Sequence, residues 1–197
     1  MSTTVEIGWE GIGELRARIA SRGLRARGLL RKAITDTQLD LYNGIIDKLS
    51  GGVLKRRTGT LSRSFRPYPI QESKDAITAI VASSNVEYAP IQERGGTIYP
   101  RTSQFLTIPL DAMLTERGVA RGSARDVISD PSAYGFTGTF FRFGMLFGVT
   151  GAGLNADITP LFLLRSSVTI PAHWFVRDTI REVEEAFRTR VEAAMGN

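Results

Sequence analysis

The sequence predicts an α+β fold, in which a mostly antiparallel sheet packs with a long N-terminal helix and a C-terminal helix, plus a long mobile excursion. Three observations predict it. Apolar residues recur at helical spacing near both ends of the chain, short apolar segments alternate with turns between them, and the connections are too short for helical crossovers. With 197 residues, 42% of them hydrophobic, the chain can bury one core, so we expect a single domain over residues 1–197.

The first long helix is predicted from one apolar stripe, which follows a short extended start at residues 5–9. The stripe has spacings of three, four and seven residues and consists of Ile12, Leu15, Ile19, Leu30, Ile34, Leu41, Ile45 and Leu49. Gly23 and Gly28 each disfavour a helix by about 1 kcal/mol relative to alanine, so we expect a bend or break within residues 22–29. The Ser-Gly-Gly sequence at 50–52 should end the helix.

Strands are predicted for the middle of the chain. Residues 64–83 contain two extended segments on either side of the polar turn Lys74-Asp75, which favours a hairpin. Two prolines mark the first of these segments as an edge strand. A short turn or helix with another strand follows at 87–101, and one more strand at 105–110.

Residues 111–138 break this pattern and are predicted to be an inserted loop or arm. They contain four glycines, mixed charge and no sustained apolar period. Ordering such a segment costs conformational entropy that one chain does not evidently compensate, so we expect it to be mobile in the free subunit. The apolar residues expected to be buried against a neighbouring subunit are Met113, Leu114, Val127 and Ile128.

The last part of the chain is predicted to be a hairpin followed by a helix. Residues 139–149 and 158–170 are the two strands. The turn between them, Gly-Ala-Gly-Leu-Asn-Ala at 151–156, fits a dinucleotide-binding pattern, but it leads into a strand where that pattern requires a helix. The final helix has an apolar stripe that consists of Val176, Ile180, Val183, Phe187, Val191 and Ala194.

The composition argues against most catalytic sites. The chain has no cysteine, and His173 is its only histidine, so a disulfide, a thiolate metal site and a cluster of imidazoles are excluded within one subunit. We interpret His173 and Trp174 as a packed aromatic start to the last helix. No nucleophile, base and orienting acid can be assembled, so we expect a protein that is not an enzyme and binds no cofactor. We also expect no secretory signal and no membrane span.

Basic residues form two clusters, within a formal net charge of +5. In the first, Arg18, Arg22 and Arg25 would share one helical face, and no acidic residue occurs between Glu14 and Asp36. This face could contact DNA phosphates, dock an acidic protein or simply be solvated. The second cluster consists of Lys55, Arg56, Arg57, Arg63 and Arg66, and Thr58 within it could cap a short helix that runs through Ser64.

Five segments together resemble one family. They are RTGTLSRS (57–64), EYAPIQERGG (87–96), LTIPL (106–110), PLFLL (160–164) and SVTIPAHWF (167–175). In this order and spacing they look like the tail-completion, or virion-morphogenesis, family of phage neck proteins, over roughly residues 10–195. The family often has Arg-Pro-Phe after its Ile-Pro-Ala, whereas His173, Trp174 and Phe175 follow Ala172 here.

The resemblance implies a non-enzymatic structural protein of a tailed-phage virion, assembled in the host cytoplasm and located in the neck. It implies a homo-oligomeric ring, with six copies by analogy, that meets head-tail connector or adaptor proteins and tail terminator or tail tube proteins around the DNA channel. The candidate residues for contact with this DNA or with a partner are Arg18, Arg22, Arg25, Lys55, Arg56 and Arg57. The alternatives are a sequence-independent DNA-binding protein that uses the basic N-terminal helix and, last, a nucleotide-dependent enzyme.

Overall fold

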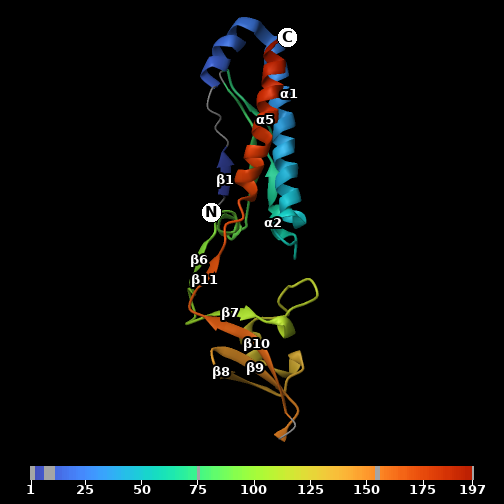
Figure 1. The fold of residues 1–197 in the computed structure, drawn as a ribbon, viewed down its shortest axis with the longest axis vertical. Coiled ribbons are helices and arrows are strands. Elements are labelled where there is room, and N and C mark those ends of the chain that lie inside the picture. Colours follow the sequence, from blue (N-terminus) through green and yellow to red (C-terminus); the bar gives the residue numbers. More distant parts are fainter. Residues whose placement is uncertain (1–2, 7–11, 75, 154–155, 197) are drawn as a thin grey trace. The chain divides into compact units, whose positions relative to one another are not determined.

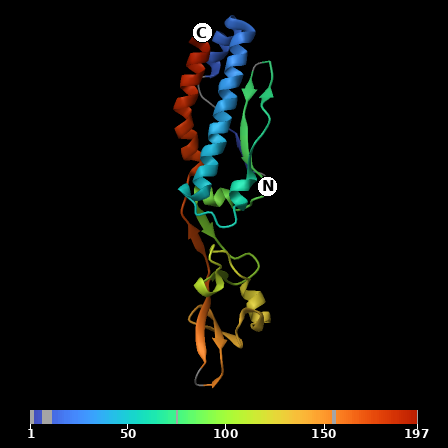
Figure 2. The ribbon, with the colours of Figure 1, turned by 90° about the vertical axis from the view of Figure 1, so that its right-hand side faces the viewer.

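The two predicted terminal helices are present and lie side by side (Figures 1 and 2). Helix α1 covers Ile12–Asp47 and helix α5 covers Phe175–Gly196. The bend expected within residues 22–29 lies at Gly23, whose φ of 74° is not helical. Beyond α1, a π-helical turn η1 (Lys48–Gly52) ends the helix at the predicted glycines.

The computed structural model describes the backbone of residues 3–6, 12–74, 76–153 and 156–196. Side chains at 3–6, 12–22, 24–26 and 195–196 are not described. Part of the extended start expected at residues 5–9, and part of the turn at 151–156, therefore lie outside the described residues.

The predicted fold class is confirmed: the chain combines helices with antiparallel sheets. It divides into two compact units, however, where the sequence predicts one domain over 1–197. Unit 1 consists of residues 1–95 and 171–197, and unit 2 consists of residues 96–170. The difference arises because unit 2 builds a buried cluster of its own.

Unit 1 pairs the two helices with a small antiparallel sheet. Its strands β1 (Thr3–Glu6), β5 (Ile80–Ser83) and β2 (Phe65–Pro67) lie in the order β1-β5-β2. The short strands β3 (Gln71–Glu72) and β4 (Ile77–Thr78) extend the predicted hairpin. Two short helices, α2 (Thr60–Ser64) and α3 (Ala89–Arg94), flank this sheet in the sequence. The buried cluster of unit 1 consists of Leu41, Ile45, Leu49, Phe65, Val81, Phe175, Val176 and Val183.

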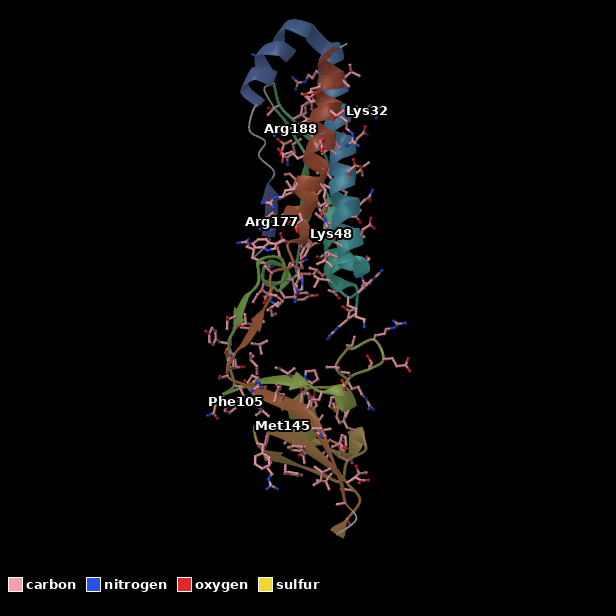
Figure 3. All side chains as sticks on the ribbon, viewed as in Figure 1. Lys32, Lys48, Phe105, Met145, Arg177 and Arg188 are labelled. Carbon is pink, nitrogen blue, oxygen red and sulfur yellow. The ribbon has the colours of Figure 1, made fainter. Side chains whose placement is uncertain are left out.

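The α1–α5 interface is held by buried and charged contacts along its length. Lys48 Nζ lies 2.6 Å from Glu182 and donates to the Thr179 hydroxyl at 3.1 Å (Lys48 is labelled in Figure 3). Nearer the C-terminal end of α5, Arg190 pairs with Asp40 at 2.6 Å. These cross-helix pairs fix the register in which the two apolar stripes meet.

Unit 2 begins and ends at a two-stranded ladder, in which β6 (Gly96–Ile98) pairs with β11 (Val168–Ile170). Beyond it lies a four-stranded antiparallel sheet in the order β7-β10-β9-β8. The strands are β7 (Leu106–Pro109), β8 (Gly138–Arg142), β9 (Met145–Thr150) and β10 (Asp157–Arg165). β9 and β10 pair directly, so the glycine-rich turn at 151–156 connects two strands of a hairpin, as predicted.

Residues 111–138 fold onto this sheet, and this corrects the expectation that Met113 and Val127 are buried against a neighbouring subunit. They form η2 (Asp111–Met113), α4 (Ala124–Ser129) and η3 (Ser132–Tyr134). Met113 and Val127 are 1% and 0% exposed and pack with Leu146, Leu161 and Phe162 of the sheet. The sheet of the same chain thus supplies the apolar surface that the sequence assigns to a partner.

A capping box fixes the start of α4. The Ser123 hydroxyl accepts from the Asp126 amide at 3.2 Å, and the Asp126 carboxylate accepts from the Ser123 amide at 3.0 Å. The hydrogen bonds from the Ser123 hydroxyl and amide lower the pKa of Asp126 below its ordinary value. This carboxylate is therefore favoured in its charged form in the folded protein.

We predict that Gly44→Ala destabilises unit 1, although alanine favours a helix. A Cβ atom at Gly44 would lie 2.6 Å from Cγ2 of Thr179, whose buried side chain donates to the Phe175 carbonyl at 2.6 Å. The expected loss is about 1–3 kcal/mol of unfolding free energy. Gly28→Ala is the matched control, because a Cβ atom there meets nothing within 4 Å, and it should gain about 0.5–1 kcal/mol. Chemical denaturation decides, and a gain in both variants would contradict the close helix contact.

We predict that the Asp126 cap weakens at low pH. Because its folded pKa lies below its unfolded pKa, its contribution to stability is complete above the ordinary carboxyl pKa and is lost as pH falls through the lowered value. The stability difference between wild type and Asp126→Asn should be constant from about pH 5 to 7 and shrink below about pH 4. Urea denaturation across this range measures it, and a difference independent of pH would contradict the cap.

Candidate functional site

Three of the five family-like segments meet at the start of α5, within unit 1. Phe65, which follows the RTGTLSRS segment, packs edge-to-face on Phe175 with ring centroids 6.0 Å apart. Helix α3, from the EYAPIQERGG segment, contacts the chain just before α5 through backbone hydrogen bonds. We call this meeting point the motif junction.

Glu93 of α3 is the central residue of the motif junction. Its two carboxylate oxygens accept hydrogen bonds from the amides of Val176 and Arg177, at 2.9 and 3.0 Å. Its backbone carbonyl accepts from the amide of Trp174 at 3.0 Å. A carboxylate in this position satisfies amides that have no carbonyl partner within α5 and complements the positive end of the helix dipole.

The residue directly before α5, Trp174, is held in an unusual backbone conformation. Trp174 has a φ of 49°, in the left-handed region that bulky residues rarely adopt. The guanidinium of Arg177 lies 3.7 Å from the centre of the Trp174 ring, a cation–π contact. His173 is half-buried, and its amide lies 3.2 Å from the carbonyls of Gln92 and Glu93. The packed aromatic start predicted for this helix is therefore present.

A pocket of about 280 Å³ opens at the motif junction. It is lined by Phe65, Ser83, Ala89, Pro90, Glu93, Arg94, Trp174, Phe175, Val176, Arg177 and Ile180. Aromatic and aliphatic groups dominate this lining, and the Glu93 carboxylate is already engaged by α5. The pocket therefore suits an apolar side chain rather than a reacting substrate.

The other two family-like segments are neighbours in unit 2. LTIPL provides β7 and PLFLL provides part of β10, and the two strands pair antiparallel from Leu106↔Arg165 to Pro109↔Phe162. LTIPL and PLFLL therefore lie in unit 2, whereas EYAPIQERGG and SVTIPAHWF each include residues of both units and meet also at the β6–β11 ladder.

The sheet of unit 2 has two different faces. Side chains directly opposite each other in an antiparallel pair point to the same face. Leu146 and Gly148 belong to the inner face, where residues 111–138 pack: a Cβ atom at Gly148 would lie 2.6 Å from Phe136. The pairs Phe140↔Phe147, Phe147↔Pro160 and Val149↔Ile158 belong to the opposite face.

This opposite face, which we call the outer face, is apolar. Its apolar residues are Leu106, Ile108, Phe140, Met145, Phe147, Val149, Ile158, Pro160 and Leu163 (Met145 is labelled in Figure 3). Two arginines share this face, Arg142 opposite Met145 and Arg165 opposite Leu106. Phe140 and Phe147 stack with centroids 5.3 Å apart, and Ile158 is 58% exposed. None of these side chains belongs to a buried cluster among the described residues. An apolar sheet face of this kind is typical of an interaction surface.

The four residues predicted to contact a neighbouring subunit differ in how exposed they are. Met113 and Val127 are buried in unit 2, so they are not available to a partner. Leu114 is half-buried and bridges to Ala120, whereas Ile128 on α4 is 43% exposed. The outer face was not predicted from the sequence, although the alternation of apolar residues in β8 and β9 is a signal for it.

The predicted basic residues are placed in two regions. The side chains of Arg18, Arg22 and Arg25 lie outside the described residues, although their backbone belongs to α1. Lys55, Arg56 and Arg57 are exposed in the turn between η1 and α2. Thr58 does not act as the N-cap of α2, which is Gly59, although its hydroxyl accepts from the amide of Thr60 at 3.3 Å.

Metal-ligand clusters and membrane-spanning helices are both absent from the described part of the chain. No group of three or more His, Asp or Glu side chains converges there as metal ligands. In the same part, no helix has both the length and the apolar character needed to cross a bilayer. Comparisons with family models, with curated proteins and with solved structures found no match to this chain.

We predict that Glu93→Ala destabilises unit 1 by about 1–2 kcal/mol, because two amides of α5 lose their partner. The control is Glu184→Ala, which removes a carboxylate from the exposed (i, i+4) pair with Arg188 and should cost less than about 0.5 kcal/mol. Thermal and chemical denaturation measure both. Equal losses would mean that Glu93 is an ordinary surface acid.

Proposed function

We propose that the chain is a structural virion protein of a tailed bacteriophage, which forms a ring in the neck and joins or completes the tail at the head–tail interface around the DNA channel. Five short segments that resemble one family meet at two places in space, and this convergence supports the proposal. Unrelated chance matches have no reason to be neighbours in the fold. Here EYAPIQERGG and SVTIPAHWF meet at the start of α5 together with Phe65, the residue after RTGTLSRS, and the other two segments form adjacent strands.

The outer face supports the proposed self-assembly. It is a continuous apolar surface of a four-stranded sheet, and the sheet also has two edge strands, β7 and β8. Apolar faces and free edges favour association with another chain, and a closed ring covers them without open-ended growth. The partner that we propose for this face is a second copy of the chain.

The proposed role is non-enzymatic. The polar groups of the motif junction hold the backbone: Glu93 accepts from α5, and Arg177 stacks on Trp174. The other proposed partners are head-tail connector or adaptor proteins on one side, and tail terminator or tail tube proteins on the other. Contact with the genome would be passive, and the virion neck is the proposed location.

The alternative is a sequence-independent DNA-binding protein that uses Arg18, Arg22 and Arg25. Those side chains lie outside the described residues, so the two functions are distinguished by experiment. Electron microscopy of the purified protein, alone and mixed with heads and with tails, is the direct test. Rings that bind at the tail end or the connector are expected. A monomer that binds DNA and neither particle would favour the alternative.

We predict that Ile158→Lys on the outer face prevents ring formation, because a buried lysine in an apolar interface has no partner for its charge. The side chain is 58% exposed, so the folded subunit should lose less than about 0.5 kcal/mol. Ile128→Lys is the matched control: this exposed position lies on α4, which packs on the inner face, and substitution there should leave the ring intact. Light scattering coupled to size exclusion measures the mass. If only Ile128→Lys abolishes assembly, the interface is on α4 and the outer face is not used.

A further inference from the structure

Two arginine side chains converge on a glycine in the turn before α2. A Cβ atom at Gly59 would lie 2.7 Å from Nε of Arg56, 3.0 Å from its Nη2 and 3.1 Å from Nη1 of Arg63. Gly59 has a φ of 72°, which disfavours any other residue as well. The glycine therefore leaves room for two guanidinium groups side by side.

The turn holds one of these groups in position. Arg63 donates from Nη2 to the carbonyl of Thr58 at 3.1 Å, and its amide donates to the carbonyl of Gly59 at 3.0 Å. The Ser62 hydroxyl also donates to the Gly59 carbonyl, at 3.0 Å. Arg63 is thus oriented by backbone contacts, which reduces the entropy lost when it binds an anion.

This arginine pair has no carboxylate partner among the described residues, unlike several other basic residues of unit 1. Ion pairs join Arg27 to Glu72, Lys32 to Asp36, Lys48 to Glu182, Arg188 to Glu184 and Arg190 to Asp40. In the described part of the chain, no such pair involves Arg56 or Arg63, nor the exposed Lys55 and Arg66 nearby. Like charges this close repel each other in the free protein, so an anion placed between them would relieve the repulsion.

We infer that this turn, which we call the arginine turn (residues 55–63), binds the phosphate groups of DNA without reading sequence. Guanidinium groups match phosphate oxygens with paired hydrogen bonds. The exposed side chains around the pair, at 55–58 and 60, are all basic or threonine, so none of these positions offers an aromatic ring to stack on bases. An interface with a protein would favour apolar anchors, which these positions lack. The choice of DNA as the polyanion rests on the proposed function.

The test is binding of fluorescein-labelled duplex DNA of mixed sequence, followed by anisotropy at several salt concentrations. Arg56→Gln/Arg63→Gln should weaken DNA binding at least tenfold. It should also reduce the magnitude of the negative slope of log K against log salt by about 2, since each lost phosphate contact contributes about 0.9. Lys32→Gln/Arg188→Gln is the matched control, because it removes the same charge from cations that are paired with carboxylates. It should change affinity less than about twofold. Equal effects of the two double variants would overturn the site.

One further variant and two further probes test whether the ligand of the arginine turn is DNA. Arg56→Gln alone leaves the Arg63–Thr58 hydrogen bond in place and should give about half of the slope change, even if the double variant folds poorly. Poly-glutamate and vesicles that contain phosphatidylglycerol are the other probes. If the double variant binds poly-glutamate or the vesicles more weakly than wild type does, but binds DNA equally well, the ligand is an acidic protein or a lipid surface, and the inference is wrong.

The mass of the assembly separates this inference from the proposed function. The double variant should form the same rings as the wild type, because the arginine turn belongs to unit 1 and the outer face to unit 2. A wild-type chain that stays monomeric yet loses DNA binding on substitution would contradict the ring and support the site. Rings in which the double variant binds DNA as well as wild type does would support the ring and contradict the site.

Discussion

The first amides of a helix have no carbonyl partner within it, and at α5 the carboxylate of Glu93 supplies one for both Val176 and Arg177. This contact joins two segments that are 83 residues apart in the sequence. Once α3 is in place, the first turn of α5 has a defined position, and Phe175 lies against Phe65. The apolar stripe of α5 then meets α1, and the charged pairs between the helices can form. The Glu93 carboxylate therefore fixes where α5 begins, and the apolar contacts of the α5 stripe then stabilise the packing of unit 1.

The parts of the fold that could be predicted are those with a long repeating pattern. Both terminal helices have apolar stripes of many turns, and the hairpins have strands with turn residues between them. Residues 111–138 could not be predicted, because their helices contain three to six residues, too few for a period to emerge. Met113 and Val127 are recognisable as core only once the sheet beneath them is known. Likewise, nothing near Glu93 in the sequence indicates the amides that it caps, and Arg56 and Arg63 look like ordinary surface charges until Gly59 brings them together.

One irregularity in β10, within residues 160–164, makes the two faces of the unit 2 sheet differ. Pairing of β10 with β9 shifts register between Pro160 and Phe162. A bulge of this kind places two consecutive residues on the same side, and both Leu161 and Phe162 are buried, at 0% and 2% exposure. The inner face thereby gains a second large side chain for residues 111–138 to cover. On the outer face, apolar residues continue across the strands without such a cover in unit 2, which is why one sheet can serve both as a core and as a surface for association.

The ladder formed by β6 and β11 also has a consequence for the order of folding. The segments that build unit 1 are separated in the chain by the whole of residues 96–170. Closing a flexible loop costs entropy that grows with the logarithm of its length, so α5 would find α1 slowly if this insert were unfolded. Once β6 pairs with β11, the effective loop shrinks to the width of one strand pair. Pairing of β6 with β11 in unit 2 therefore brings together the two parts of the chain that form unit 1. Because α5 is synthesised after unit 2, its docking partner is already near, which shortens the time that its apolar stripe is exposed.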